Sequence, residues 1–227
     1  SWPLDRQRSA WEGVCKMFQS PRPASVTVED LDIDGTHVRL YRPQGKGLKP
    51  GCLYFHGGGW VVGSCETHDD MVAEMAEGAG CVMAMVDYRL APEHPHPAQL
   101  EDSLKVLLWM RQKGEEHGID SGCIMAAGDS AGGQMTAGLA LMLRDAGIDQ
   151  LRGQVLIYPV LGADTETASY IVNRDAPNLT RDEMVFYLES FLGPRGNSNW
   201  SDPYAVPNIA ADASGLPPAF ITVAGHD

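Results

Sequence analysis

The sequence has 227 residues, 44% of them hydrophobic, which is enough to bury a sizeable core in one domain with a small subdomain attached. Thirty acidic residues against 17 basic ones give a formal net charge of −13, which excludes a typical nucleic-acid or anionic-membrane binder and favours a neutral or cationic small-molecule partner. No apolar stretch approaches the ~18 residues of a membrane span. The five cysteines show no C-x-x-C spacing, so we expect buried, reduced thiols in a cytoplasmic protein, without disulfides or zinc.

The N-terminal part predicts a helix followed by a β-hairpin. Residues 11–18 carry Trp, Val, Cys and Phe at i, i+3, i+4 and i+7, the pattern of an amphipathic helix, and two prolines follow it. Residues 26–33 and 37–41 then alternate apolar and polar side chains on either side of Asp34 and Gly35. Such a pattern is typical of a hairpin at the edge of a sheet.

From residue 52 onward, short apolar strands alternate with helices, which indicates a parallel sheet covered by helices. The last two strands, at residues 155–158 and 220–223, are separated by about 60 residues, too many for a plain crossover. An inserted element is expected between them, and residues 180–183 match a helix-capping box there. The predicted strand and helix pairs are 52–55 with 67–77, 81–87 with 99–113, and 123–127 with 131–146.

Residues 128–132 read Gly-Asp-Ser-Ala-Gly, between a predicted strand and a predicted helix. This is the context of a nucleophile elbow, in which small neighbours let the chain fold back tightly around a strained serine. Ser130 would lie at a helix N-terminus, where unpaired N–H groups favour developing negative charge. The pattern predicts a nucleophile, although Gly, Ser and Ala are common enough for the motif alone to arise by chance.

A second motif follows the strand at residues 52–55, where residues 56–60 read His-Gly-Gly-Gly-Trp. Consecutive glycines expose backbone N–H groups that no side chain blocks. Facing Ser130, these groups could form an oxyanion hole together with the N–H of Ala131. A flexible glycine-rich turn is the alternative, but the order of the two motifs within an α/β pattern favours the catalytic interpretation.

With these motifs, the sequence resembles the bacterial-type hormone-sensitive-lipase-like carboxylesterases (acetyl esterases) of the α/β-hydrolase fold. The resemblance implies a mostly parallel sheet with an N-terminal antiparallel hairpin and a helical cap. We therefore expect a cap helix in residues 1–24, a hydrolase core in 25–160, a cap insertion and loop in 161–207, and a final core strand in 208–227. Further matching stretches lie at residues 87–98, 158–159, 202–205 and 216–220.

The resemblance also implies roles for individual residues. Ser130 matches the nucleophile, and Gly58, Gly59 and Ala131 match the oxyanion donors. His56 and Gly57 support their own loop, and Asp129 marks the group of the family with an acidic residue before the serine. Members hydrolyse esters of short- to medium-chain acids and need no cofactor, so a small-molecule ester is the expected partner.

The sequence offers a candidate for the acid of the catalytic triad but not for its histidine. Asp227 follows the strand at residues 220–223, where the family keeps its triad carboxylate, but in this fold the histidine comes after the acid. His226 adjoins Asp227, and a neighbour at i−1 points away, so the aspartate could not orient its ring. We expect the base on a further strand and helix beyond Asp227, and residues 1–227 alone to be nearly inactive. An uncovered strand edge would also favour a homodimer.

Three alternatives concern other residues and another function. Glu93, His94 and His96 are close in sequence, but prolines hold that stretch extended, and we expect no metal there. A non-catalytic, receptor-like protein on the same fold, as in the plant gibberellin receptors, is the alternative function. Aromatic residues of the two predicted cap helices are candidate pocket walls, although such residues more often pack in the core; they are Trp11, Phe18, Phe186 and Tyr187.

Overall fold

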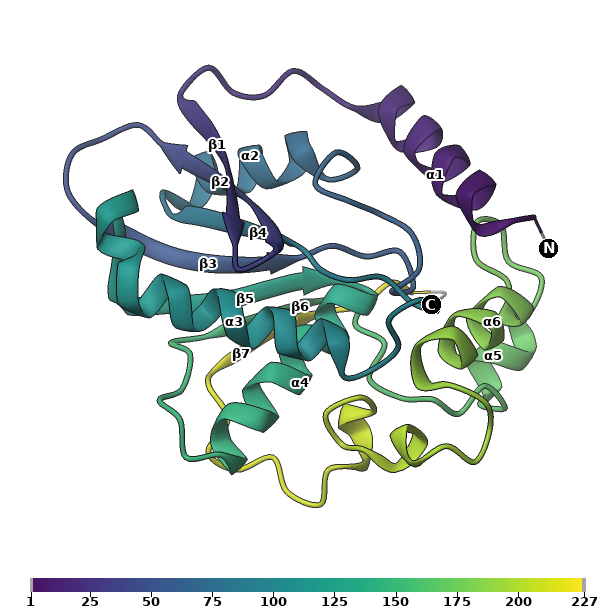
Figure 1. Cartoon of the computed structure of the whole chain (residues 1–227). Coiled ribbons are helices and arrows are strands. Elements are labelled where there is room, and N and C mark those ends of the chain that lie inside the picture. Colours follow the sequence, from purple (N-terminus) through teal and green to yellow (C-terminus); the bar gives the residue numbers. More distant parts are fainter. Residues whose placement is uncertain (1, 226–227) are drawn as a thin grey trace.

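The computed structural model describes residues 2–225 and contains a seven-stranded sheet in the order β1-β2-β4-β3-β5-β6-β7 (Figure 1). The hairpin is antiparallel, and Asp34 and Gly35 at its turn have φ values of 48° and 82°, as the twist of a two-residue turn requires. The second hairpin strand pairs antiparallel with β4, and the remaining pairs are parallel, which confirms the predicted sheet. The strands are β1 (Val26–Ile33), β2 (Thr36–Pro43), β3 (Lys49–Phe55), β4 (Val82–Asp87), β5 (Ile119–Asp129), β6 (Gln154–Ile157) and β7 (Ala219–Thr222).

Helices cover both faces of the sheet, and the alternation of side chains along β3 shows why. Leu53 and Phe55 are buried in the core that contains residues of α3 and α4, whereas Cys52 and Tyr54 point to the core beneath α2. Figure 1 shows the helices on the corresponding sides of the sheet. They are α2 (Asp69–Ala79), α3 (Ala98–Lys113), which a short 3₁₀ turn η1 (Gly114–His117) follows, and α4 (Ala131–Asp145).

Three further helices lie beyond one end of the sheet (Figure 1): α1 (Leu4–Phe18), α5 (Ala168–Val172) and α6 (Arg181–Leu192). The predicted capping box is present at the start of α6, where Thr180 and Glu183 satisfy each other's backbone N–H groups. Short 3₁₀ turns, η2 (Ser198–Ser201) and η3 (Pro207–Ile209), lead back to the sheet. Within residues 2–225, no helix combines the length and the apolar character needed to cross a membrane.

The N-terminal helix predicted over residues 11–18 is present within α1. None of its residues is buried, and Phe18 is 80% exposed. Arg8 connects the helix to the core, because it donates from Nε to the Val61 carbonyl at 2.8 Å and forms an ion pair with Glu93 at 2.7 Å. The sequence also predicted that the five cysteines are buried. This prediction is confirmed for Cys52 and Cys65, whereas the other three cysteines are half-buried.

Candidate active site

Ser130 lies between β5 and α4 with φ 54° and ψ −115°, a backbone conformation that costs a non-glycine residue ~1–3 kcal/mol. Two bonds over-determine this turn: the Ser130 N–H donates to the Ile157 carbonyl at 2.9 Å, and the Gln134 N–H donates to the Ser130 carbonyl at 3.1 Å. The strand, turn and helix predicted around the motif are all present. The serine is therefore held in a strained position at the N-terminus of a buried helix.

The glycines of the motif are required by close backbone packing. A Cβ on Gly128 would lie 2.7 Å from the Phe55 carbonyl oxygen, and one on Gly132 would lie 3.0 Å from that of His56. Both distances are shorter than carbon and oxygen atoms normally tolerate. The end of β3, and with it the start of the glycine-rich loop, can pack against the serine turn only because these side chains are missing.

The glycine-rich loop after β3 turns back on itself beside Ser130. Gly58 has φ 117° and Gly59 φ 57°, both in the region that favours glycine. The N–H groups of Val61 and Val62 donate to the Gly58 carbonyl at 3.1 and 3.0 Å. Trp60 fixes the turn to α4, because its indole N–H donates to Gln134 Oε1 at 3.0 Å. The loop therefore holds Gly58 and Gly59, which have no side chains of their own, in a fixed conformation beside Ser130.

Asp129 joins the serine turn to this loop through a buried carboxylate. Its Oδ1 accepts hydrogen bonds from the Gly57 N–H at 3.0 Å and from the Tyr54 hydroxyl at 2.8 Å, while Oδ2 lies 3.4 Å from His68 Nε2. Burial alone would raise the pKa of Asp129, but the hydrogen bonds from His68 and Tyr54 outweigh it and lower the pKa. The sequence placed Asp129 in the motif but gave no sign that it anchors the oxyanion loop.

His56 is fully buried and supports the loop from within. Its Nδ1–H donates to the Gly57 carbonyl at 2.7 Å, and its ring stacks on Tyr88 with centroids 4.3 Å apart. The Tyr88 hydroxyl donates to the His56 carbonyl at 2.8 Å. Burial, together with the nearby His68, lowers the pKa of His56 to about 4, so its ring is neutral at physiological pH.

Ser130 lies where two cavities meet. One, of about 390 Å³, is bounded by Gly57, Gly58 and Gly59 and has mostly apolar walls, with Trp11 and Tyr187 among them. The other, of about 470 Å³, extends on the opposite side and contains polar side chains. Of the four aromatic residues proposed as walls, Trp11 and Tyr187 are confirmed, whereas Phe18 and Phe186 line neither cavity. The residues shared by both cavities are Ser130, Tyr158, Val160, Leu179 and Met184.

The remaining sequence candidates are placed as follows. Asp227 and His226 lie outside the residues that the structure describes. Glu93 pairs with Arg8, and His96 Nε2 lies 2.8 Å from Asp202 Oδ2, so that stretch is engaged in separate ion pairs. Ala131 is completely buried as the first residue of α4.

The strained serine, the glycine-rich loop and the sheet order are those of an α/β hydrolase, and a family model described as alpha/beta hydrolase fold matches residues 52–227. Carboxylesterase NlhH of Mycobacterium tuberculosis is 42% identical over 192 residues, which cover 84% of this chain and 60% of NlhH. Esterase LipI of the same organism is 39% identical over 92% of this chain and 67% of LipI. The chain therefore belongs to the hormone-sensitive-lipase-like carboxylesterase family.

The solved structures agree with this assignment. A Pyrobaculum calidifontis esterase superposes with a TM-score of 0.87 at 36% identity, covering 97% of this chain and 74% of that one. The chain thus spans about three quarters of that structure and 60% of the length of NlhH.

Proposed function

We propose that this chain carries the nucleophile and the oxyanion hole of a carboxylic ester hydrolase. The observation that carries the proposal is the strained Ser130 at the junction of two cavities, beside Gly58 and Gly59. Strain of this kind persists only where the surrounding structure enforces it, and it clusters at functional sites. The esterase names of the relatives support the same reaction.

In the proposed mechanism, Ser130 Oγ attacks the acyl carbonyl of the ester and gives its proton to a histidine. The carbonyl electron pair moves to oxygen, where the N–H groups of Gly58, Gly59 and Ala131 stabilise it. The carbonyl re-forms and the alkoxide leaves with the proton from the histidine, after which water hydrolyses the acyl-enzyme by the same steps. We propose Asp227 as the carboxylate that orients this histidine.

The two cavities support a model in which the acyl part and the alcohol part of the ester bind in different places. The cavity bounded by the glycine loop has apolar walls from Val62, Met71 and Tyr187, which suit a short- to medium-chain acyl group. The second cavity contains Asp164, Thr167 and Arg181, and we assign it to the alcohol part. The receptor-like alternative is less well supported, because a receptor has no chemical need for a strained serine.

The test is covalent labelling of the full-length protein with a fluorophosphonate, followed by mass spectrometry. We expect one adduct, on Ser130, and turnover of p-nitrophenyl butyrate that Ser130→Ala abolishes. Ser198→Ala, which removes an exposed hydroxyl outside the site, serves as the matched control and should keep both. Failure of Ser130 to react would favour the receptor-like alternative.

The organisation of the protein is also a proposal. We propose α1 and residues 161–207 as a cap over a core of residues 25–160 and 208–227, with a homodimer as the assembly. The five free cysteines are consistent with the cytoplasmic location that we propose. Light scattering after size exclusion would decide the dimer, because a concentration-independent monomer mass would exclude it.

A further inference from the structure

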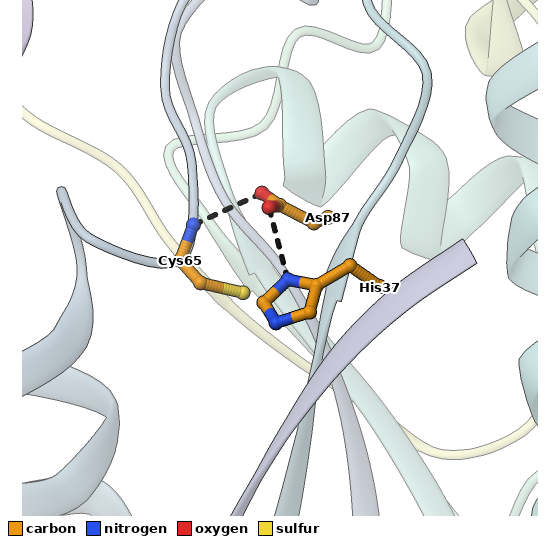
Figure 2. A group of neighbouring side chains, drawn as sticks. All are labelled: His37, Cys65 and Asp87. Carbon is orange, nitrogen blue, oxygen red and sulfur yellow. Dashed lines mark hydrogen bonds and ion pairs between the residues drawn. The ribbon is translucent and has the colours of Figure 1, made fainter. Parts of the chain in front are cut away.

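A second group of chemically reactive side chains lies away from Ser130, where β2 meets β4. His37 and Asp87 are direct cross-strand partners on these two strands, and Cys65 lies in the segment between the glycine loop and α2. One ligand atom from each residue lies within 4.8 Å of the others (Figure 2). Among the described residues, this is the one set of histidine, cysteine and acidic side chains close enough to hold a metal ion.

We propose that His37 Nδ1, Cys65 Sγ and Asp87 Oδ2 form a binding site for a zinc-type divalent cation, with the fourth position open to water. The Nδ1 to Oδ2 distance is 3.1 Å, close to the ~3.3 Å edge of a tetrahedron whose metal bonds are ~2.0–2.1 Å long. A mixed N, S and O donor set suits zinc or cobalt rather than magnesium or calcium. Three protein ligands and one open position is the coordination that zinc adopts when it keeps a water.

The surroundings of His37 and Asp87 are those of metal ligands. His37 Nε2 lies 3.2 Å from Asp30 Oδ1, and Arg39 holds Asp30 in place with bonds of 2.7 and 3.2 Å. In the structure the ring donates from Nδ1–H to Asp87 Oδ2 at 3.1 Å. With a cation bound at Nδ1, the Asp30 carboxylate beside Nε2 would give the carboxylate–histidine arrangement that orients metal-binding imidazoles. On the other side, the Cys65 N–H donates to Asp87 Oδ1 at 3.0 Å, so a cation would compete only with the His37 Nδ1–H for Oδ2.

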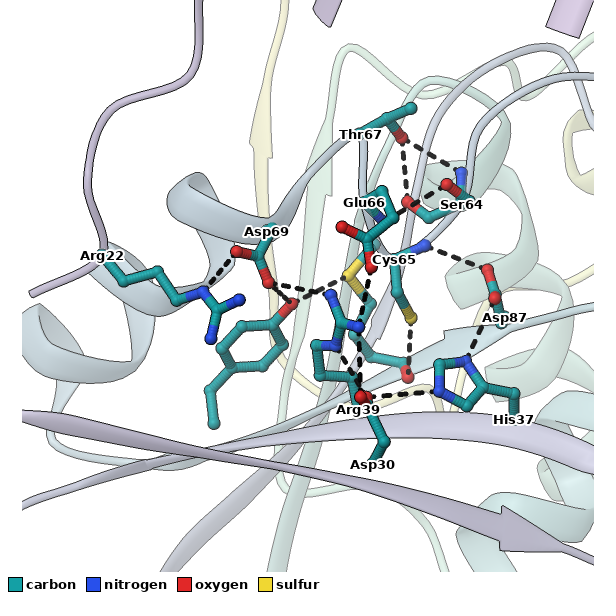
Figure 3. Close-up of polar contacts among 12 residues, drawn as sticks. Arg22, Asp30, His37, Arg39, Ser64, Cys65, Glu66, Thr67, Asp69 and Asp87 are labelled. Carbon is teal, nitrogen blue, oxygen red and sulfur yellow. Dashed lines mark hydrogen bonds and ion pairs between the residues drawn. The ribbon is translucent and has the colours of Figure 1, made fainter. Parts of the chain in front are cut away.

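Charge in this region also favours a cation. Figure 3 shows the network of polar contacts, in which the guanidinium of Arg39 is shared among Asp30, Glu66 and Asp69. Carboxylates outnumber guanidinium groups four to two in this network, and a divalent cation would balance the excess. The carboxylates are Asp30, Glu66, Asp69 and Asp87, and the guanidinium groups are Arg22 and Arg39.

Cation binding must release protons. The Cys65 side chain is buried, and its S–H donates to the Met85 carbonyl at 3.8 Å. On binding, the Cys65 S–H bond and the His37 Nδ1–H bond break and their protons pass to water, and the thiolate sulfur, Nδ1 and Asp87 Oδ2 each contribute a lone pair to the cation. The charged groups that face these ligands are Asp30 on β1, Asp87 on β4 and Arg39 on β2.

Cobalt titration of the full-length, metal-free protein tests the site, because a cobalt–thiolate bond produces a ligand-to-metal absorption band that oxygen and nitrogen ligands do not. We expect this band at one equivalent of Co²⁺, its disappearance when Zn²⁺ is added, and a rise in the thermal unfolding midpoint with Zn²⁺. The result does not depend on esterase activity.

Variants decide which residues bind. Cys65→Ser should lose the thiolate band, and Asp30→Asn, which removes only the carboxylate behind His37, should weaken Co²⁺ binding ~10–100-fold. Cys81→Ser removes a half-buried thiol elsewhere and should keep the band. His37→Gln is a second ligand variant, at a half-exposed position, should Cys65→Ser fail to fold. A wild-type protein without the band, or a band retained in Cys65→Ser, would overturn the proposal.

Discussion

The aromatic ring of Tyr187 on α6 lies directly over Gly59 of the glycine-rich loop, and Trp60 of the same loop stacks on Phe191 of α6. A Cβ on Gly59 would lie 2.6 Å from Cδ1 and 2.7 Å from Cδ2 of the Tyr187 ring, and Gly59 has a φ of +57°. Real Cβ atoms do not approach other carbons so closely. Gly59→Ala must therefore displace the ring or the loop, in addition to adopting a left-handed backbone conformation.

The two parts of this cost can be separated. Overpacking of a well-filled contact costs ~1–3 kcal/mol, and a left-handed conformation costs an alanine ~1–2 kcal/mol. Gly59→Ala should therefore lower the free energy of unfolding by ~2–5 kcal/mol in the wild-type background. In a Tyr187→Ala background the ring is gone, and only the backbone cost remains. The expected coupling between the two positions is thus the overpacking part, ~1–3 kcal/mol.

Urea denaturation of the wild type, both single variants and the double variant measures this coupling. Gly80→Ala is the matched control, because Gly80 has φ +64° but a Cβ there would meet nothing within 4 Å. It should cost the backbone part alone, whether or not Tyr187 is present. If Gly59→Ala cost no more than Gly80→Ala, or cost the same without Tyr187, the ring would not lie over the glycine and the reasoning would be refuted.

Two further predictions concern the serine turn. Ser130→Gly should raise the free energy of unfolding by ~1 kcal/mol, because glycine relieves the strain at φ 54°. The same variant should lose fluorophosphonate labelling. If urea titration showed that it is less stable than the wild type, the serine turn would not be strained. Asp129→Asn should destabilise the protein by ~2–3 kcal/mol at neutral pH. Because folding lowers the pKa of Asp129, its carboxylate stabilises the fold above the unfolded value of ~3.9, and the difference from wild type should shrink as pH falls below that value. A difference independent of pH would contradict this assignment.

Much of the fold could be predicted because its signals are local in the sequence. The alternation of strands and helices, the turn at Asp34 and Gly35 and the capping box at Thr180 each lie within a few residues. The glycines that allow close backbone packing also lie next to Ser130 in the sequence or directly after β3. The serine turn and the glycine-rich loop could therefore both be recognised from the sequence. The element boundaries were less accurate, since β5 is Ile119–Asp129 and begins before the apolar run that predicted it.

The parts that escaped prediction depend on pairings across strands. Asp129 meets Gly57 only because β5 and β3 are parallel neighbours, and 72 residues separate the two in the chain. His37 and Asp87 meet through the antiparallel pairing of β2 with β4, over a separation of 50 residues. Sequence motifs for metal sites do not include ligands separated by so many residues, so they could not predict the proposed site. The exposure of Phe18 was missed for a related reason, since helical periodicity does not reveal whether a core lies beside the apolar face.

The glycine-rich loop, which we propose to carry the oxyanion donors, is fixed at both ends in the same way. At its start, Asp129 accepts the Gly57 N–H and faces His68; after its end, Asp87 accepts the Cys65 N–H and faces His37. Hydrogen bonds to charged acceptors contribute ~1.5–3 kcal/mol each, about twice as much as neutral ones. Because the two carboxylates stand on different strands of one rigid sheet, the glycine N–H groups between them are fixed before any substrate arrives. Fixed donors are what the stabilisation of a developing oxyanion requires, since no energy is then spent on orienting them during the reaction.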